Sequence, residues 1–255
     1  MHFTLFFLAA SLLMGAQAQP SGERPLVIRG QRQDVYCYMN RSAPLYGRVL
    51  FLPGDGGWRG FAVDIAEKVA SWGYVVCGMD TRKYLENFTQ GNAVLKEEDV
   101  VADLHAAAAW MRDSAPDKTI YVGWSEGANL GVLATSHTES TKAFRGFVAI
   151  GLGESGILRW RWQDYTTWVT KKRPDEPRYQ TAPHIPRIAP LPFFMIHASQ
   201  DEYTSVERAK ELFASAGEPK QLRFVQARDH RFAGGRDEFF RVLQEALEWI
   251  RRMAP

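Results

Sequence analysis

Short apolar runs alternate with amphipathic segments along most of the chain, which predicts a regular succession of strands and helices. The apolar runs are rich in β-branched residues, whereas the segments between them repeat their apolar positions at helical spacing. Strands are predicted at 26–29, 35–39, 48–52, 74–79, 118–124, 144–152, 191–197 and 222–226. Helices are predicted at 61–72, at 97–112, from residue 126 onward, from a capping box at 204–207 through residue 216, and at 237–253.

This alternation predicts an α/β fold. The first two strands are expected to form a hairpin, and the repeating strand–helix units a mostly parallel sheet with both faces covered. Residues 153–190 break the rhythm with prolines, charges and aromatic residues, so an insert is expected there. Because ligands gather at the carboxyl ends of parallel strands, chemistry is expected in the loops directly after the strands.

The first 18 residues have the organisation of a signal peptide. An apolar run at 3–13 precedes Gly15-Ala16-Gln17-Ala18, a cleavage site of the A-x-A type, so Gln19 is the expected mature start. An uncleaved membrane anchor fits less well, because a span needs about 20 apolar residues. A secreted or periplasmic location follows, with a single domain at 19–255.

Composition narrows the function classes. The 255 residues are 45% hydrophobic and 24% charged, as in globular proteins, and the formal net charge of +2 argues against binding nucleic acid through charge. Two cysteines, Cys37 and Cys77, are too few for a zinc ribbon or a disulfide-dense scaffold. They lie on strands expected to be neighbours, where either a disulfide or two buried thiols would fit.

One catalytic motif lies after a predicted strand. Gly123-Trp124-Ser125-Glu126-Gly127 matches G-x-S-x-G, between the fifth strand and a helix. A serine held in such a tight turn needs small neighbours, and its hydroxyl then stands above the sheet edge beside a helix N-terminus. This context favours a nucleophile over a serine that merely caps the helix.

A serine nucleophile requires a base, and the base requires an orienting carboxylate. In this topology the expected chain order is Ser, acid, His. Asp201 follows the seventh predicted strand and His230 follows the eighth, so Ser125, Asp201 and His230 are the predicted catalytic residues. Glu202 is the nearest rival acid, and His197 is expected in the core or behind Asp201.

The remaining site residues follow from the chemistry of acyl transfer, which develops an oxyanion that needs backbone donors. The N–H groups of Asp55, in a glycine loop after the third strand, and of Glu126 are the predicted donors. This machinery needs no metal and no organic cofactor. Substrate contacts are predicted for Gly56, Trp58, Trp124, Trp160 and Trp162.

The Ser125 elbow with Asp201 and His230 downstream resembles the α/β-hydrolase superfamily over nearly the whole mature chain. More narrowly, Phe-Leu-Pro-Gly-Asp-Gly-Gly-Trp at 51–58, with Tyr-Val-Val at 74–76 and Tyr84 after it, resembles the bacterial virulence VirJ/AcvB family. The resemblance implies an α/β-hydrolase fold and export to the periplasm. It also implies hydrolysis of aminoacyl-phosphatidylglycerol in one branch and assembly of a secretion system in the other.

The chain departs from this family at the elbow, where Glu126 and Asn129 stand in place of an aromatic residue and Asp. The insert at 153–190 occupies the position of a cap. From 156 to 190 it holds seven basic and three acidic residues among five Trp and Tyr residues. Such a composition suits peripheral contact with a membrane or an anionic headgroup. We favour a lid whose aromatic residues pack on the sheet while its charges are solvated.

The sequence therefore predicts an exported serine hydrolase that cleaves a carboxylic ester or related acyl bond of a small molecule or lipid, as a monomer or small homo-oligomer. The alternative is a non-catalytic periplasmic accessory protein that binds a partner of a secretion or virulence system on the same fold. Acyl transfer to an acceptor other than water is a third option.

Overall fold

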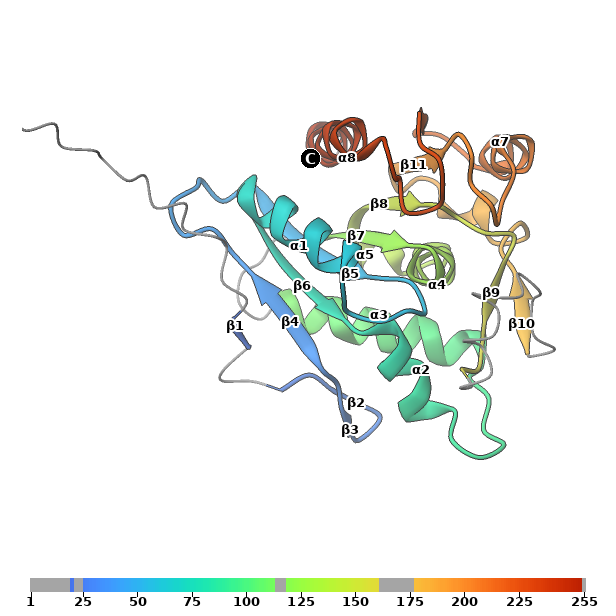
Figure 1. Cartoon of the computed structure of the whole chain (residues 1–255). Coiled ribbons are helices and arrows are strands. Elements are labelled where there is room, and N and C mark those ends of the chain that lie inside the picture. Colours follow the sequence, from blue (N-terminus) through green and yellow to red (C-terminus); the bar gives the residue numbers. More distant parts are fainter. Residues whose placement is uncertain (1–18, 21–24, 113–117, 161–176, 254–255) are drawn as a thin grey trace, which may run out of the picture.

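An eight-stranded, mostly parallel sheet forms the centre of the computed structural model, which describes residues 19–20, 25–112, 118–160 and 177–253 (Figure 1). Its strand order is β1-β4-β6-β5-β7-β8-β11-β12. The first two strands in this order are antiparallel to their neighbours, and the six from β6 to β12 are parallel. The strands are β1 (Gln19–Pro20), β4 (Val35–Tyr38), β5 (Gly47–Leu52), β6 (Tyr74–Met79), β7 (Thr119–Trp124), β8 (Phe144–Ile150), β11 (Phe193–Ala198) and β12 (Lys220–Val225).

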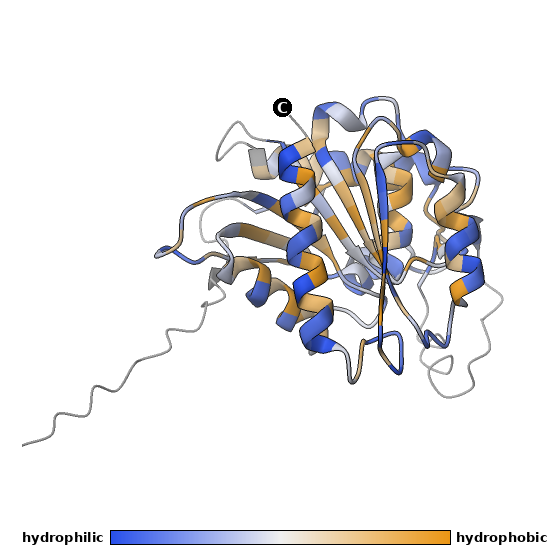
Figure 2. Cartoon of the chain, turned by 90° about the horizontal axis from the view of Figure 1, so that it is seen from above, coloured by the Kyte–Doolittle hydropathy of each residue, from blue (hydrophilic) through white to orange (hydrophobic). Residues whose placement is uncertain are grey.

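Helices cover both faces of this sheet. α1 (Phe61–Ser71) and α8 (Arg236–Met253) pack on one face, and α3 (Glu97–Arg112), α4 (Glu126–Thr135) and α7 (Val206–Ser215) pack on the other. In Figure 2 the strands are largely apolar, and the helices turn their apolar sides towards them. Each face thus has its own apolar core, which the amphipathic helices separate from water. The predicted α/β class and parallel sheet are confirmed.

The predicted hairpin between the first two strands is wrong. β2 (Val27–Ile28) pairs instead with β3 (Gln31–Arg32), and β4 joins the main sheet beside β6. The reason is the two-residue turn Arg29-Gly30, whose φ angles of 46° and 77° are both positive. Two positive φ angles favour a tight hairpin turn, so the chain reverses before it reaches β4.

The helices differ from the prediction in two places. The sequence analysis missed the helix α2 (Thr81–Phe88), because few of its residues are buried. The capping box at 204–207 is displaced by one residue, since Ser205 is the N-cap of α7 and accepts a hydrogen bond from the N–H of Arg208. Thr204 instead lies buried in the loop before the helix. A short helix, α5 (Ser140–Ala143), precedes β8.

The insert has more regular structure than expected. β9 (Ser155–Ile157) and β10 (Arg178–Gln180) pair in antiparallel fashion, and a 3₁₀ helix, η2 (Ile185–Ile188), follows them. The predicted signal peptide, Trp162, and most of the basic residues of the insert lie outside the described residues. Within the described ranges, no helix is long and apolar enough to cross a membrane.

A disulfide joins the antiparallel part of the sheet to the parallel part. Cys37 of β4 and Cys77 of β6 are direct partners in the strand register, with Cα atoms 4.2 Å apart. The structure thereby decides between the two states that the sequence left open, in favour of the disulfide.

Candidate active site

Ser125 lies in a sharp turn between β7 and α4. Its φ and ψ angles are 57° and −120°, a backbone conformation that non-glycine residues rarely adopt. The Ser125 N–H donates to the carbonyl of Ile150 at 2.9 Å, and the Ser125 carbonyl accepts from the N–H groups of Ala128 and Asn129. The neighbouring strand and the helix together hold this strained residue, as expected for a nucleophile elbow.

The two motif glycines are required by close packing of the elbow. A Cβ atom on Gly127 would lie 1.9 Å from the carbonyl oxygen of Leu52, and one on Gly123 would lie 2.4 Å from the carbonyl oxygen of Gly127. Both contacts are with backbone, which has little freedom to move away. The G-x-S-x-G spacing therefore reflects how tightly α4 packs against β5 and β7.

Asp201 and His230 are joined by a hydrogen bond. The Nδ1 atom of His230 lies 2.6 Å from Oδ2 of Asp201, and the side chain of Asp201 is fully buried. Asp201 follows β11 and His230 follows β12, so adjacent parallel strands bring the two loops together. Since a carboxylate accepts, Nδ1 carries the proton and Nε2 is the basic nitrogen.

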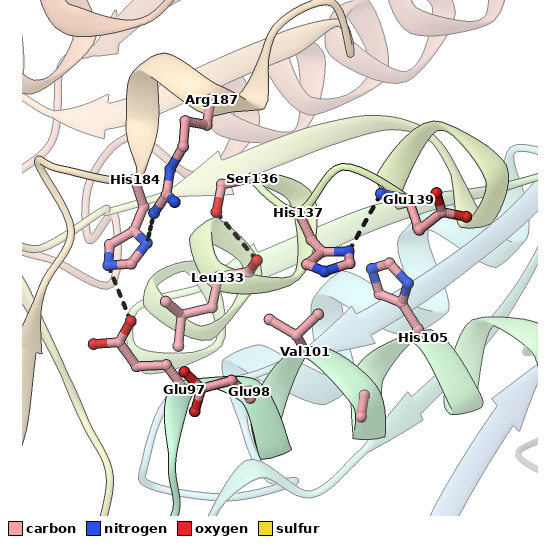
Figure 3. Close-up of a pocket in the computed structure, with 11 residues that line it drawn as sticks. Glu97, Glu98, Val101, His105, Leu133, Ser136, His137, Glu139, His184 and Arg187 are labelled. Atoms are coloured by element: carbon pink, nitrogen blue, oxygen red, sulfur yellow. Dashed lines mark hydrogen bonds and ion pairs between the residues drawn. The ribbon is translucent and has the colours of Figure 1, made fainter.

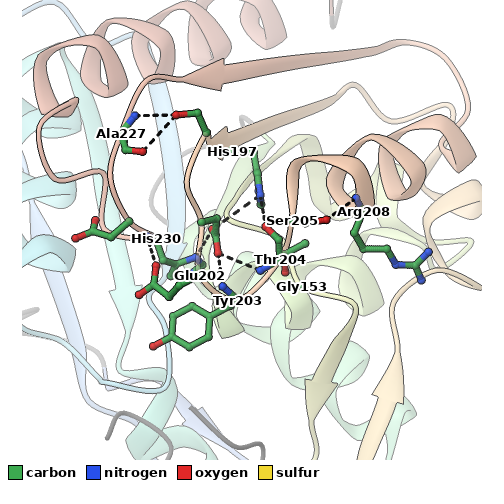
Figure 4. Close-up of polar contacts among 12 residues, drawn as sticks. Gly153, His197, Glu202, Tyr203, Thr204, Ser205, Arg208, Ala227 and His230 are labelled. Atoms are coloured by element: carbon green, nitrogen blue, oxygen red, sulfur yellow. Dashed lines mark hydrogen bonds and ion pairs between the residues drawn. The ribbon is translucent and has the colours of Figure 1, made fainter. Parts of the chain in front are cut away.

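The loop after β11, which contains Tyr203 and Thr204 (Figure 4), fixes the Asp201 carboxylate. Its Oδ1 atom accepts from the N–H groups of Tyr203 and Thr204, at 2.9 and 3.1 Å. Burial alone would raise the pKa of Asp201, but the hydrogen bond and charge of His230, with the Tyr203 N–H, outweigh burial and lower that pKa. Asp201 is therefore ionised over the neutral range.

His197 supports the same loop from the core. Its side chain is fully buried, and Nε2 donates to the carbonyl of Thr204 at 2.9 Å. Nε2 also lies 3.9 Å from Oδ2 of Asp201. Burial lowers the pKa of His197, which favours the neutral form of the ring. The prediction that His197 lies in the core behind Asp201 is confirmed.

His230 is packed on several sides. Its ring stacks on Trp124, with centroids 6.0 Å apart, and meets the edge of Tyr203 at 5.2 Å. Glu202 accepts a hydrogen bond from the backbone N–H of His230, and so contacts the main chain rather than the imidazole. Nε2 of His230 is buried and has no hydrogen-bond partner among the described residues.

Ser125 and His230 lie against the same segment at the end of β8. Ser125 bonds Ile150, and a Cβ atom on the next residue, Gly151, would lie 2.5 Å from the His230 ring. Asp201 is thus bonded to His230, and Ser125 lies nearby. The Ser125 hydroxyl makes no hydrogen bond to Nε2 of His230 in this structure. Such bonds are often long without substrate and shorten when it binds.

The glycine loop after β5 lies beside the nucleophile. A Cβ atom on Gly54 would lie 3.1 Å from Cβ of Ser125 and 3.5 Å from its Oγ. The Gly57 N–H donates to the Gly54 carbonyl at 3.1 Å and closes a turn that contains Asp55 and Gly56. Glu126 is the first residue of α4, where backbone N–H groups have no partner within the helix. Of the two predicted donor residues, Glu126 follows Ser125 directly in the chain, and Asp55 follows Gly54, which lies against Ser125.

The side chain of Glu126 has a role that the sequence did not reveal. Its two carboxyl oxygens accept from the Ile157 N–H at 2.8 Å and from the Asn129 side chain at 3.1 Å. Burial raises its pKa to about 8, with Asp55 adding to the rise, while the hydrogen bonds from Ile157 and Asn129 oppose it. Nothing local predicts this contact, because Ile157 lies in the insert.

The residues predicted to contact substrate lie in different places relative to the candidate site. Trp124 packs between Phe61 and His230, at the edge of the candidate site. Trp58 packs against β4, where its ring stacks on Tyr36. Trp160 lies under the guanidinium of Arg82, 4.5 Å from the ring centroid, and Gly56 lies in the glycine loop.

A separate cleft lies between α3, the end of α4 and η2 (Figure 3). It has a volume of about 370 Å³ and is lined by acidic and histidine side chains over the apolar side chains of Val101 and Leu133. His184, from the insert, lies here and pairs with Glu97 at 3.3 Å. None of the predicted catalytic residues lines this cleft.

Comparison with known families identifies the chain. The model of the bacterial virulence protein VirJ matches residues 48–232, which include the glycine loop, Ser125, Asp201 and His230. The chain belongs to the VirJ family. No curated protein is similar in sequence to this VirJ-family chain.

Solved structures show that this VirJ-family chain has the α/β-hydrolase fold. An esterase domain from Rhodothermus marinus is 16% identical, with a TM-score of 0.63 over 92% of this chain and 98% of that domain. A dienelactone hydrolase from Anabaena variabilis is 16% identical, with a TM-score of 0.65 over 92% and 98%. An esterase from Pyrococcus furiosus is 17% identical, with a TM-score of 0.66 over 91% and 92%. At such identities the likeness establishes the fold, and the predicted α/β-hydrolase fold is confirmed.

Proposed function

We propose that this VirJ-family chain is a serine hydrolase that cleaves a carboxylic ester or a related acyl bond. The observation that carries the proposal is the 2.6 Å bond between Asp201 and His230, in a ring whose Nε2 has no other partner among the described residues. A general base needs one ring nitrogen that is available to take the proton of the nucleophile, and Nε2 of His230 meets this requirement while Asp201 holds Nδ1. The strained backbone of Ser125, held beside this ring, supports the same proposal.

In the proposed mechanism, Oγ of Ser125 attacks the acyl carbon while Nε2 of His230 removes its proton. Asp201 holds the tautomer and stabilises the imidazolium that forms. The N–H groups of Asp55 and Glu126 stabilise the oxyanion. His230 then protonates the leaving group, an acyl-serine remains, and a water molecule activated by His230 releases the acid.

We also propose that the protein works outside the cytoplasm, after cleavage behind Ala18. The Cys37–Cys77 disulfide supports this location, because disulfides persist in oxidising compartments and are rare in the cytosol. Export and cleavage can be tested together. Protein recovered from the periplasm of an expression host should have the mass of a chain that begins at Gln19.

The function is tested with a fluorophosphonate probe, which reacts with activated serines. The wild-type protein should be labelled, and the Ser125→Ala and His230→Ala variants should react at least about a thousandfold more slowly. Circular dichroism provides the control that both variants are folded. A folded wild-type protein that stays unlabelled would contradict the proposal and favour the non-catalytic accessory protein. Labelled protein would then be screened with short acyl esters and aminoacyl lipids.

A further inference from the structure

The glycine loop that contains Asp55 is held by a segment far away in the sequence. The loop follows β5, and the junction between β6 and α2 lies next to it, because β5 and β6 are parallel neighbours with Phe51 opposite Gly78. Two consecutive residues of that junction, Asp80 and Thr81, reach the loop. We propose that Asp80 and Thr81 are positioning residues that hold the oxyanion loop against Ser125, an inference that rests on the proposed hydrolase function.

The two side chains bind opposite ends of the loop. The Thr81 hydroxyl donates to the Pro53 carbonyl at 2.6 Å, and Oδ2 of Asp80 accepts from the Trp58 N–H at 2.9 Å. Thr81 is fully buried and Asp80 is 8% exposed, so water does not compete for these bonds. The other oxygen of Asp80 accepts from the Lys83 N–H at 3.0 Å, which fixes the carboxylate on α2.

The stretch between these two bonds is the one that faces the nucleophile. Gly54 approaches Ser125 from one side, and Gly57, with a φ of +80°, approaches Asp80 from the other. A Cβ atom on Gly57 would lie 2.9 Å from Oδ2 of Asp80. The loop is thus confined between Ser125 and Asp80, and the N–H of Asp55 lies within the confined part.

Position matters here because an oxyanion donor works only at about 2.7–3.1 Å from the developing charge. A displacement of about 1 Å lowers a rate by about a hundredfold. Loss of the Thr81 bond leaves the Pro53 carbonyl buried without its donor and releases one end of the loop. The rate of the chemical step should then fall, whereas the initial binding of a probe should change little.

The charge of Asp80 makes a second, opposite test possible. A carboxylate near a forming oxyanion is electrostatically unfavourable, so removing its charge alone would accelerate the reaction. The Asp80→Asn variant keeps one acceptor oxygen but turns an amide N–H₂ towards one of the two backbone donors. If Asp80 acts by geometry, this variant reacts more slowly in spite of its lost charge.

The experiment measures the limiting rate and the half-saturation concentration of fluorophosphonate labelling for Thr81→Val, Thr81→Ser and Asp80→Asn. Thr135→Val is the matched control, because Thr135 is also fully buried and donates to a carbonyl, that of Gly131, at 2.7 Å. We expect the limiting rate of Thr81→Val to fall by between about 10- and 100-fold, with rescue in Thr81→Ser. Thr135→Val should keep the wild-type limiting rate, because this hydroxyl bonds within α4 and does not contact the loop.

The outcomes are distinguishable. If the wild type is labelled and Thr81→Val reacts at the same limiting rate, the inference fails while the proposed function stands. If Thr81→Val and Thr135→Val slow equally, Thr81 has only a general structural role and the inference also fails. A folded wild type without labelling overturns both. If Thr81→Val does not fold, Asp80→Asn provides the test. Labelling slower than in the wild type supports the inference, and labelling that is as fast or faster contradicts it.

Discussion

Two adjacent carboxylates, Asp201 and Glu202, both contact His230, yet only one can orient its ring. Asp201 bonds the imidazole Nδ1 at 2.6 Å, whereas Glu202 bonds the backbone N–H at 2.8 Å. A backbone bond fixes the loop but has no influence on which ring nitrogen carries the proton. The two residues therefore form a matched pair for testing tautomer control.

We expect Asp201→Asn to lower kcat by about 10³- to 10⁴-fold, because an amide favours the wrong tautomer of His230. Glu202→Gln keeps a carbonyl oxygen for the His230 N–H and should lower kcat by less than about tenfold. Both variants are compared on one ester substrate, with melting temperature as a folding control. A larger loss in Glu202→Gln than in Asp201→Asn would contradict the assignment of Asp201.

The catalytic candidates at this scale were predictable from sequence, whereas the residues that support them were not. Ser125 directly follows one apolar run, and Asp201 and His230 lie in the loops after two others; the parallel topology then brings such positions to one edge of the sheet. Thr81 and Glu126 act through contacts 28 and 31 residues away, at Pro53 and Ile157. Such contacts leave no local pattern in the sequence, because the two residues come together only when the sheet has folded.

At the scale of elements, α4 and the insert strand β9 are joined by polar side chains in the core. Asn129 donates to the Ser155 carbonyl and accepts from the Gly153 N–H, while Glu126 accepts from Ile157. These bonds fix the start of the insert on the helix that begins after Ser125. They occur at the two elbow positions where the chain departs from the family pattern that we expected.

Burial of Glu126 predicts an unusual dependence of stability on pH. Its pKa is about 8 in the folded protein, against an ordinary value of 4.5, so the folded state binds the proton more tightly than the unfolded chain. The free energy of unfolding should therefore fall as pH rises from about 4.5 to 8, by up to about 1.4 kcal/mol per pH unit. Above that range both states are ionised and the slope should vanish.

Urea unfolding at pH 5, 6, 7 and 8 measures this slope. Glu126→Gln does not titrate, so its decline over the range should be smaller than that of the wild type. The exposed Glu139 provides the control: its hydrogen bond to Lys142 lowers its pKa, and Glu139→Gln should keep the wild-type slope. Parallel curves for Glu126→Gln and the wild type would rule out Glu126 as the source.

The elements that the sequence misplaced share a physical cause. α2 buries only Thr81, Tyr84 and Leu85, so its apolar pattern is too sparse to separate it from a loop. The early reversal at Arg29-Gly30 depends on two positive φ angles, for which a single glycine is a weak signal. By contrast, β6 and α3 were predicted to the residue: β6 is a nearly continuous buried run, and the 16-residue α3 buries Val100, Leu104, Ala108 and Met111.

At the scale of the whole molecule, the disulfide joins two parts of the sheet that differ in direction. β4 is antiparallel, and it reaches the parallel strands only through β6, where Cys37 meets Cys77. Trp58, in the loop after β5, packs on β4: its ring stacks on Tyr36, and its Nε1 donates to the Tyr38 hydroxyl at 3.1 Å. The glycine loop before Trp58 is thus anchored on the part of the sheet that the disulfide secures.

Reduction should therefore destabilise the protein without unfolding it. The cysteines are 40 residues apart. A disulfide that closes a loop of that length lowers the entropy of the unfolded chain and so stabilises the folded state by about 4 kcal/mol. Urea unfolding with and without a phosphine reductant should show a loss of that order in the wild type. The double variant Cys37→Ser/Cys77→Ser should be similarly destabilised and insensitive to reductant. Two free thiols in protein recovered from an oxidising compartment would contradict both the disulfide and its support for export. Reduction is also expected to slow fluorophosphonate labelling of the folded protein if β4, through its contacts with Trp58, helps to hold the glycine loop in place.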